Sequence, residues 1–186
     1  MVVEYSTINL VRLPSTRRGL QWSPERVPHV TLREIAPDIE EAVLELRVAP
    51  AQEQFVSGVA RSLIDAATEP EAHPWIRAVV ADGVPVGFVM VSWDVVPVPH
   101  RLWGPYFLWR LLVDTRHQGH GHGTAAVRLV AEAVRADGGD TLYTSCGQGE
   151  GSPQPFYEGL GFVPTGEVDS HGEVHLALDL TGSRGG

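Results

Sequence analysis

The segment Gln118–Thr124 limits the folds open to this chain more sharply than any other part of it. Its glycines alternate with other residues, an apolar run from Tyr106 to Val113 precedes it, and a helical pattern begins near Gly121. A strand that ends in such a loop and turns into a helix directs several backbone N–H groups toward one point, at the positive end of the helix dipole. The sequence therefore predicts a strand–loop–helix unit that binds a phosphate or diphosphate.

Two familiar phosphate-binding motifs do not fit this loop. The dinucleotide-binding pattern Gly-x-Gly-x-x-Gly, counted from Gly119, requires a glycine at the position of Thr124. The nucleoside-triphosphate loop requires Gly-Lys-Ser/Thr, which the chain lacks. What remains is Gln-x-x-Gly-x-Gly, with Gln118, Gly121 and Gly123 at the fixed positions, although an ordinary glycine-rich turn would also produce it.

This pattern resembles the Arg/Gln-x-x-Gly-x-Gly/Ala signature of the GNAT superfamily of N-acetyltransferases. Val113–Arg116 is similar to the Val-Asp-x-x lead-in of that family, and Pro155–Phe162 is similar to its Phe-Tyr-x-x-x-Gly-Phe motif. The resemblance covers about residues 30–180 and implies acetyl-CoA as the cofactor, with its diphosphate on the glycine loop. It also implies that the central strand and the next one splay apart and hold the pantetheine arm between them.

Composition excludes several other classes of protein. A chain of 186 residues with 43% hydrophobic content is long enough for one domain with its own core. No apolar run is long enough for a transmembrane helix, the N-terminus does not resemble a signal peptide, and Cys146 is the single cysteine. We therefore expect a cytoplasmic protein that does not bind a membrane.

The net charge indicates which partners the chain can bind. The chain has 14 Lys and Arg against 23 Asp and Glu, a formal net charge of −9. Such a balance disfavours binding to nucleic acid and permits a small cationic amine as substrate. Dimers are frequent in the resembled family, so a homodimer is a further expectation.

Periodicity and turn signals predict the element order β-α-α-β-β-β-α-β-α-β-β. The predicted strands cover residues 29–35, 75–81, 85–93, 106–113, 141–146, 162–168 and 173–180, and the predicted helices cover 38–46, 50–67, 121–138 and 154–160. The fold class is α/β, an α+β sandwich around a GNAT-like mixed, mostly antiparallel sheet of about seven strands flanked by about four helices. We expect an irregular arm over residues 1–28, a single domain over 29–180 and a flexible tail over 181–186.

Acetyl transfer from a thioester to an amine requires a site for the diphosphate and a hydrogen bond to the thioester carbonyl. The predicted diphosphate site consists of the backbone N–H groups of Gln118, Gly119, His120, Gly121, His122, Gly123 and Thr124. The family resemblance places the N–H group that binds the carbonyl on the preceding strand, at Leu111, Leu112 and Val113. One such donor typically stabilises the transition state by about 3–4 kcal/mol.

The reaction also needs a proton for the departing thiolate. The family resemblance places Tyr157 beside the sulfur, and a phenol with a pKa near 10 carries its proton at neutral pH. The alternative is a tyrosine that only packs the last helix against the sheet.

The base that deprotonates the amine is the least determined residue. Some GNAT enzymes carry a glutamate four residues before the position of Leu111, but Phe107 stands there in this chain. Asp94, after the hairpin strand, is the predicted base, and Glu41 and His100 are weaker options. The missing glutamate keeps open a non-catalytic acyl-CoA-binding module as an alternative function.

The histidines of the loop do not predict a metal site. His117, His120 and His122 occupy variable positions of the motif, where alternating side chains rarely converge on one ion, and Cys146 is the only thiol. We expect instead a partly charged His120 or His122 beside the phosphate. Cys146 as a nucleophile would need a histidine partner that the sequence does not place.

A narrower resemblance concerns the acceptor. Leu44–Val48, Gln52–Val56, Ser62-Leu63 and Leu108–Arg110 are similar to the spermine/spermidine acetyltransferase-like branch of bacterial GNAT proteins. This implies a polyamine-like acceptor, while an antibiotic or a protein amine remains an alternative. The aromatic residues Trp93, Trp103, Tyr106 and Trp109 belong either to the core or to the acceptor cleft.

Overall fold

The computed structural model describes residues 29–98 and 103–183. Seven strands form one sheet in the order β1-β2-β3-β4-β5-β7-β6, in which β4 and β5 are parallel and all other neighbours are antiparallel. The strands are β1 Val30–Arg33, β2 Pro74–Ala81, β3 Val84–Ser92, β4 Phe107–Val113, β5 Thr141–Cys146, β6 Val163–Val168 and β7 Val174–Asp179, and the helices are α1 Glu40–Leu44, α2 Val59–Thr68, α3 His122–Ala136 and α4 Gln154–Gly159. The predicted fold class and element order are confirmed.

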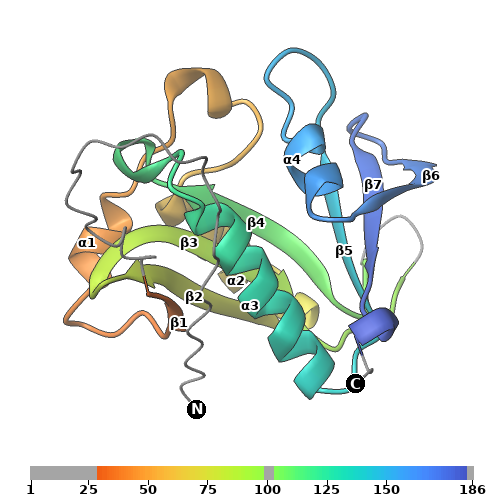
Figure 1. Cartoon of the computed structure of the whole chain (residues 1–186), viewed down its shortest axis with the longest axis horizontal. Coiled ribbons are helices and arrows are strands. Elements are labelled where there is room, and N and C mark those ends of the chain that lie inside the picture. Colours follow the sequence, from red (N-terminus) through yellow and green to blue (C-terminus); the bar gives the residue numbers. More distant parts are fainter. Residues whose placement is uncertain (1–28, 99–102, 184–186) are drawn as a thin grey trace, which may run out of the picture.

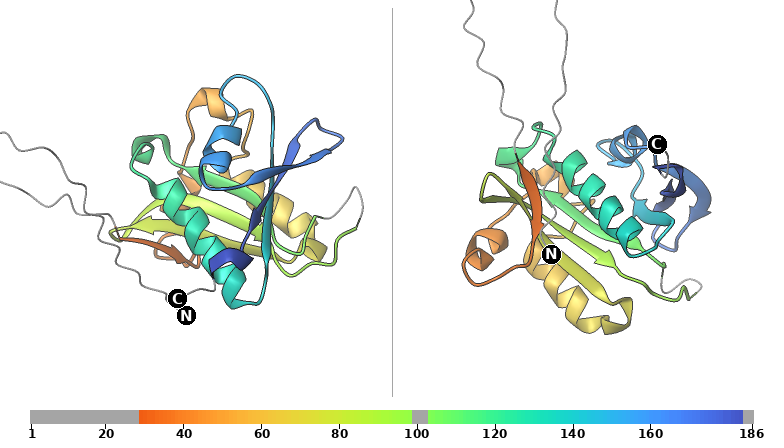
Figure 2. Two further views of the ribbon diagram at one scale, coloured as in Figure 1. Left: turned by 45° about the vertical axis from the view of Figure 1, so that its right-hand side comes forward. Right: turned by 60° about the horizontal axis from the view of Figure 1, so that its bottom comes forward.

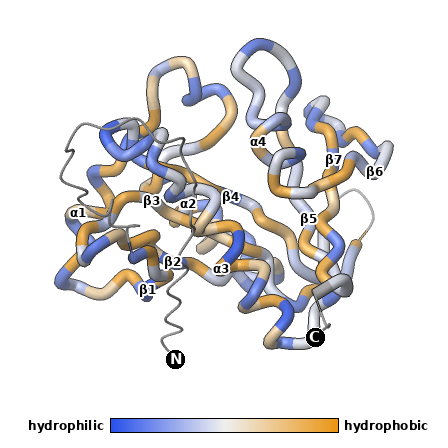
Figure 3. The backbone as a smooth tube through the Cα atoms, in the orientation of Figure 1, coloured by the Kyte–Doolittle hydropathy of each residue, from blue (hydrophilic) through white to orange (hydrophobic). Residues whose placement is uncertain are grey.

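Helices cover both faces of the sheet. Helix α3 lies on one face, and α1 and α2 lie on the other (Figures 1 and 2). Each interface has its own core, with Val127 and Val130 of α3 buried on one side and Phe88 and Met90 of β3 buried under α1 and α2 on the other. Hydrophobic residues accordingly concentrate along the strands and the inward helix faces (Figure 3).

The first hairpin forms as its turn sequence predicts. Asp82 and Gly83 join β2 to β3 with φ values of 48° and 84°. Positive φ at both central residues is the requirement of a type I′ turn, for which Asp-Gly is a preferred sequence.

The helix predicted over residues 50–67 is divided in two, so that prediction was wrong in its first half. Pro50–Gln52 forms a 3-10 helix, a turn follows, and α2 begins only after Gly58. The side-chain oxygen of Gln52 accepts hydrogen bonds from Ala49 N (3.1 Å) and from Gln118 Nε2 (2.8 Å). The contact with Gln118 ties the segment to the glycine loop.

Strands β4 and β5 pair over a short distance and then separate. Their register contains two pairs, Phe107 with Tyr143 and Leu108 with Thr144. The Thr144 hydroxyl donates a hydrogen bond to the Leu108 carbonyl (3.0 Å) at the last pair. Beyond this point the strands diverge (Figure 1), as the family resemblance implied.

Some of the predictions fall wholly or partly on residues that the structure does not describe. The arm over residues 1–28 and His100 lie outside the described residues. Thr181–Ser183 forms a 3-10 helix at the start of the predicted tail. Among the helices of the described residues, none is long and apolar enough to span a membrane.

Candidate active site

A cleft of about 520 Å³ opens where β4 and β5 separate. Its walls come from both strands, from the glycine loop at the start of α3, from α4 and from the segment around Phe55. Segments that are distant in sequence therefore meet at the same opening.

The glycine loop presents unpaired N–H groups to this cleft. Gly119 and Gly121 both have φ of +79°, and Gly121 caps the 15-residue helix α3. Among the described residues, no group accepts a hydrogen bond from the backbone N–H groups of residues 120–124. Free N–H groups at the positive end of a helix dipole are the elements of an anion site.

The two motif glycines serve different purposes. Gly121 needs its left-handed backbone, and a Cβ there would meet no atom within 4 Å. At Gly123 a Cβ would lie 3.3 Å from the Phe156 ring and 3.6 Å from Val113 Cγ2. Gly123 therefore lets the loop pack against Phe156, which belongs to the second motif.

Gln118 positions the loop through its side chain. Its Nε2 donates to Val113 O (2.9 Å) and to Gln52 Oε1 (2.8 Å). The fixed glutamine of the motif thus joins the end of β4 to the segment before α2.

Of the three β4 residues predicted to hold the carbonyl donor, two face the cleft. Asp114 N donates to Val86 O (2.9 Å), and residues of an antiparallel ladder face their partner strand in alternation. The N–H group of Leu112 consequently faces β3, whereas those of Leu111 and Val113 face away from it. Leu111 and Val113 line the cleft, and Leu112 is buried in the core under α1 and α2.

Tyr157 lines the cleft from α4, next to the last β4–β5 pair. It is 7% exposed, and burial raises its pKa to about 12, against a smaller lowering by the Thr144 hydroxyl. The phenol therefore keeps its proton at neutral pH, as a proton donor must.

The two histidines predicted to lie partly charged beside the phosphate, His120 and His122, have different surroundings. His122 is 6% exposed and its Nδ1 has no partner among the described residues. Burial, followed by the neighbouring His120 and His117, lowers the pKa of His122, which disfavours the charged form of this ring. His117 and His122 line the cleft, whereas His120 does not. Within residues 29–98 and 103–183 no His, Cys, Asp and Glu cluster is arranged to hold a metal.

Other predicted chemistry lies away from the cleft. Asp94 is exposed with φ of +50°, beyond the end of β3, and neither Asp94 nor Glu41 lines the cleft. Burial raises the pKa of the Cys146 thiol, which does not favour a thiolate nucleophile.

The predicted aromatic cluster divides between the core and the cleft. Trp93 Nε1 and the Tyr106 hydroxyl both donate to Asp137 at the end of α3 (2.9 Å each). Trp103 instead packs against His175, with ring centroids 3.7 Å apart and ring planes inclined by 35°. Trp109 lines the cleft.

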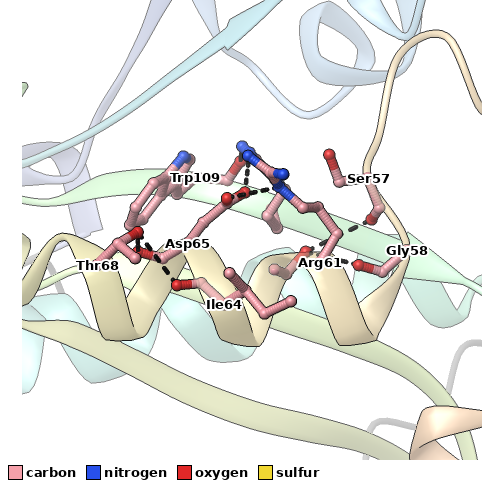
Figure 4. Close-up of polar contacts among 9 residues, drawn as sticks. Ser57, Gly58, Arg61, Ile64, Asp65, Thr68 and Trp109 are labelled. Carbon is pink, nitrogen blue, oxygen red and sulfur yellow. Dashed lines mark hydrogen bonds and ion pairs between the residues drawn. The ribbon is translucent and has the colours of Figure 1, made fainter.

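A charged group that the sequence analysis missed lies beside Trp109. Arg110 lines the cleft and donates to Asp65 of α2 (3.3 Å), and Asp65 also accepts from Arg61 Nε (2.8 Å; Figure 4). Burial lowers the pKa of Arg110, while Asp65 raises it. No local motif marks this pair, because its members lie 45 residues apart.

A second missed pair joins β5 to the start of β7. The Ser145 hydroxyl, which lines the cleft, donates a hydrogen bond to Glu173 Oε2 (2.5 Å). Periodicity along the chain reveals neither partner.

Three features fit the class of acyltransferases that the sequence motifs indicated. They are the order of the strands, the separation of the parallel strands β4 and β5, and the candidate anion site at the start of α3. The sequence profile of the Acetyltransferase (GNAT) family matches residues 40–162, and the chain belongs to this family.

Solved structures support the same fold. A GNAT-family protein from Desulfovibrio desulfuricans is 22% identical with a TM-score of 0.59, over 82% of this chain and 99% of that one. PaiA N-acetyltransferase from Thermoplasma acidophilum, in complex with coenzyme A, is 11% identical with a TM-score of 0.56, over 81% and 98%. An aminoglycoside 6'-N-acetyltransferase complexed with coenzyme A is 17% identical with a TM-score of 0.58, over 81% and 96%. No curated protein sequence matches the chain significantly.

Proposed function

We propose that this protein transfers the acetyl group of acetyl-CoA to a primary amine, by direct attack of the amine in a ternary complex. The observation that carries the proposal is the set of unpaired N–H groups at residues 120–124, next to the opening between β4 and β5. Two structures of the same fold, PaiA and the aminoglycoside enzyme, are in complex with coenzyme A. The diphosphate of the cofactor would bind at the start of α3.

The residues of the cleft divide the remaining tasks. The N–H group of Leu111 faces the opening and would donate to the thioester carbonyl, where negative charge develops during attack. Tyr157 would return a proton to the sulfur that leaves. Phe156 packs on Gly123 and so holds α4 against the loop.

The acceptor is proposed to be a small cationic amine of the polyamine type. The net charge of −9 favours the approach of a cation. An amine of an antibiotic or of a protein is the alternative, and a panel of acceptors distinguishes them. Binding of acetyl-CoA without release of thiol for any acceptor would indicate a binding module, which Phe107 at the usual glutamate position would favour.

The test of this function is the variant Tyr157→Phe, assayed by release of free thiol. We expect kcat to fall about 100-fold at pH 7, because the proton donor is lost, while calorimetry shows unchanged affinity for acetyl-CoA. Tyr143→Phe is the matched control, since Tyr143 lies on β5 and does not line the cleft. Equal activity of the two variants would contradict the role of Tyr157.

A further inference from the structure

Glu173 is held in a fixed place at the start of β7. Asp169 Oδ1 accepts hydrogen bonds from His171 N (2.8 Å) and Glu173 N (3.0 Å), and Asp169 N donates to Glu173 O (3.0 Å). These bonds close the turn between β6 and β7. The backbone that carries the Glu173 carboxylate is therefore restrained.

The side chain of Glu173 is attached to the wall of the cleft. Ser145 lines the cleft and donates from Oγ to Glu173 Oε2. The register of β5 and β7 places Cys146 opposite Val174, directly after Glu173. The other oxygen, Oε1, accepts no hydrogen bond from the part of the chain that the structure describes.

Glu173 and Tyr157 lie on opposite faces of the split sheet. Cys146 of β5 packs with Tyr157 in the core under α3. Neighbouring residues of a strand point to opposite faces, so Ser145 points to the face of α2, where Asp65 meets Arg110. The opening between β4 and β5 thus has the Tyr157 phenol on one face and the Ser145 hydroxyl on the other, and Ser145 in turn is hydrogen-bonded to the Glu173 carboxylate behind it.

The charged and titratable groups around Glu173 come from each neighbouring element. They are Arg110 of β4, Cys146 of β5, Tyr157 of α4, and Asp169 and His175 of the β6–β7 hairpin. The negative charge of Glu173 contributes to the raised pKa of both Tyr157 and Cys146 and counteracts the lowering of that of Arg110. Its charge therefore acts inside the cleft.

We infer that Glu173, which does not itself line the cleft, takes the proton from the ammonium group of the acceptor by way of the Ser145 hydroxyl, the task for which Asp94 was predicted. The inference rests on the proposed function. One proton passes from the ammonium to Ser145 Oγ as the Ser145 hydroxyl gives its own proton to Glu173, and the neutral nitrogen forms a bond to the carbonyl carbon. The C–S bond then breaks with its electron pair on sulfur, which takes a proton from Tyr157. The nitrogen loses its second proton, by way of solvent, to Tyr157, and Glu173 releases its own proton to solvent.

The variant Glu173→Gln tests this inference because it keeps the shape of the side chain and the bond from Ser145. We expect kcat/KM to fall about 100-fold at pH 7. The variant must use amine that is already neutral, a fraction that grows about tenfold per pH unit below an amine pKa near 10.4. Its kcat/KM should therefore rise with pH and approach the wild-type value near pH 10.

A second measurement does not depend on turnover. Calorimetry with the acceptor, in the presence of coenzyme A, should show weaker acceptor binding by Glu173→Gln and unchanged coenzyme A binding. Glu167→Gln is the matched control, because Glu167 is an exposed residue of β6 in the same hairpin. It should behave as the wild type in both measurements.

Three negative results would count against the inference, and they do not all have the same meaning. A Glu173→Gln variant within about threefold of the wild type at every pH would overturn the inference while leaving the proposed function intact. Loss of activity by a constant factor at all pH values would also overturn it, because a structural defect behaves in this way. If the wild type itself releases no thiol with any amine, the proposed function fails and the role of Glu173 fails with it.

Discussion

Asp114 holds the junction between β4 and the glycine loop. Its carboxylate accepts four hydrogen bonds, from Arg47 N (3.0 Å), Arg116 N (2.9 Å), Arg116 Nε (2.8 Å) and Arg116 Nη2 (3.1 Å). The Arg116 guanidinium holds the pKa of Asp114 well below its usual range, although burial acts in the opposite direction. A single side chain thus anchors the loop at the point where it leaves the sheet.

The variant Asp114→Asn should lower the free energy of unfolding by about 2 kcal/mol at pH 7, because charge-assisted hydrogen bonds are lost. The folded pKa is depressed, so the stabilisation is present above the unfolded pKa of about 3.9 and disappears as the pH falls below it. Urea unfolding at pH 7 and at pH 3 should therefore show a smaller difference between variant and wild type at pH 3. Asp38→Asn is the control, since its exposed pair with Arg33 should contribute less than about 1 kcal/mol.

At the scale of elements, the critical feature is the short seam between β4 and β5. The parallel pairing ends at Leu108 and Thr144, and the Thr144 hydroxyl secures it by bonding to Leu108 O (3.0 Å). This hydroxyl is buried with its residue at 1% exposure. The seam sets where the cleft begins.

Thr144→Val should lower the free energy of unfolding by about 1–3 kcal/mol, because the buried Leu108 carbonyl loses its donor. Thr141→Val on the same strand is the control, since within the described part of the chain the Thr141 hydroxyl bonds to the exposed Asp140 carboxylate alone. Urea unfolding of both variants measures the difference. Equal stability of the two would mean that the seam does not depend on the side-chain bond.

Element order was predictable, but the course of residues 50–58 was not. The signals for hairpin, central strand and α3 are local, because Asp82-Gly83 and the loop glycines act on their own backbones. The segment before α2 is held by the contact of Gln52 with Gln118, which is 66 residues away. Helical periodicity carries no information on such a contact.

At the scale of the whole molecule, net charge and cleft act together. The surplus of carboxylates attracts cations over several ångströms, whereas the wall of the cleft pairs Arg110 with Asp65. Long-range attraction is therefore expected to govern the encounter with a cationic acceptor, and short-range contacts its orientation.

If electrostatic attraction governs the encounter with the acceptor, added salt should lower kcat/KM for a polyamine. Raising ionic strength from about 0.05 M to about 0.5 M shortens the screening length, so kcat/KM for a polyamine should fall at least about threefold while kcat changes little. A monoamine whose single ammonium group is its only charge should be affected less. Identical salt dependence for both acceptors would contradict electrostatic attraction of polyamines.

Local pattern was sufficient for the order of the strands and helices and for the glycine loop, although not for the course of residues 50–58, because hydrogen bonding and backbone conformation within about fifteen residues specify most of these elements. The arrangement of the groups proposed for catalysis was visible only in the packed chain. Ser145 reaches Glu173 across 28 residues and Arg110 reaches Asp65 across 45, through strand register and helix packing. Asp94 matched the chemistry expected of a base, yet β3 leads it away from the opening. Which carboxylate can receive the proton of the acceptor depends on three-dimensional packing, since charge and residue type do not specify position.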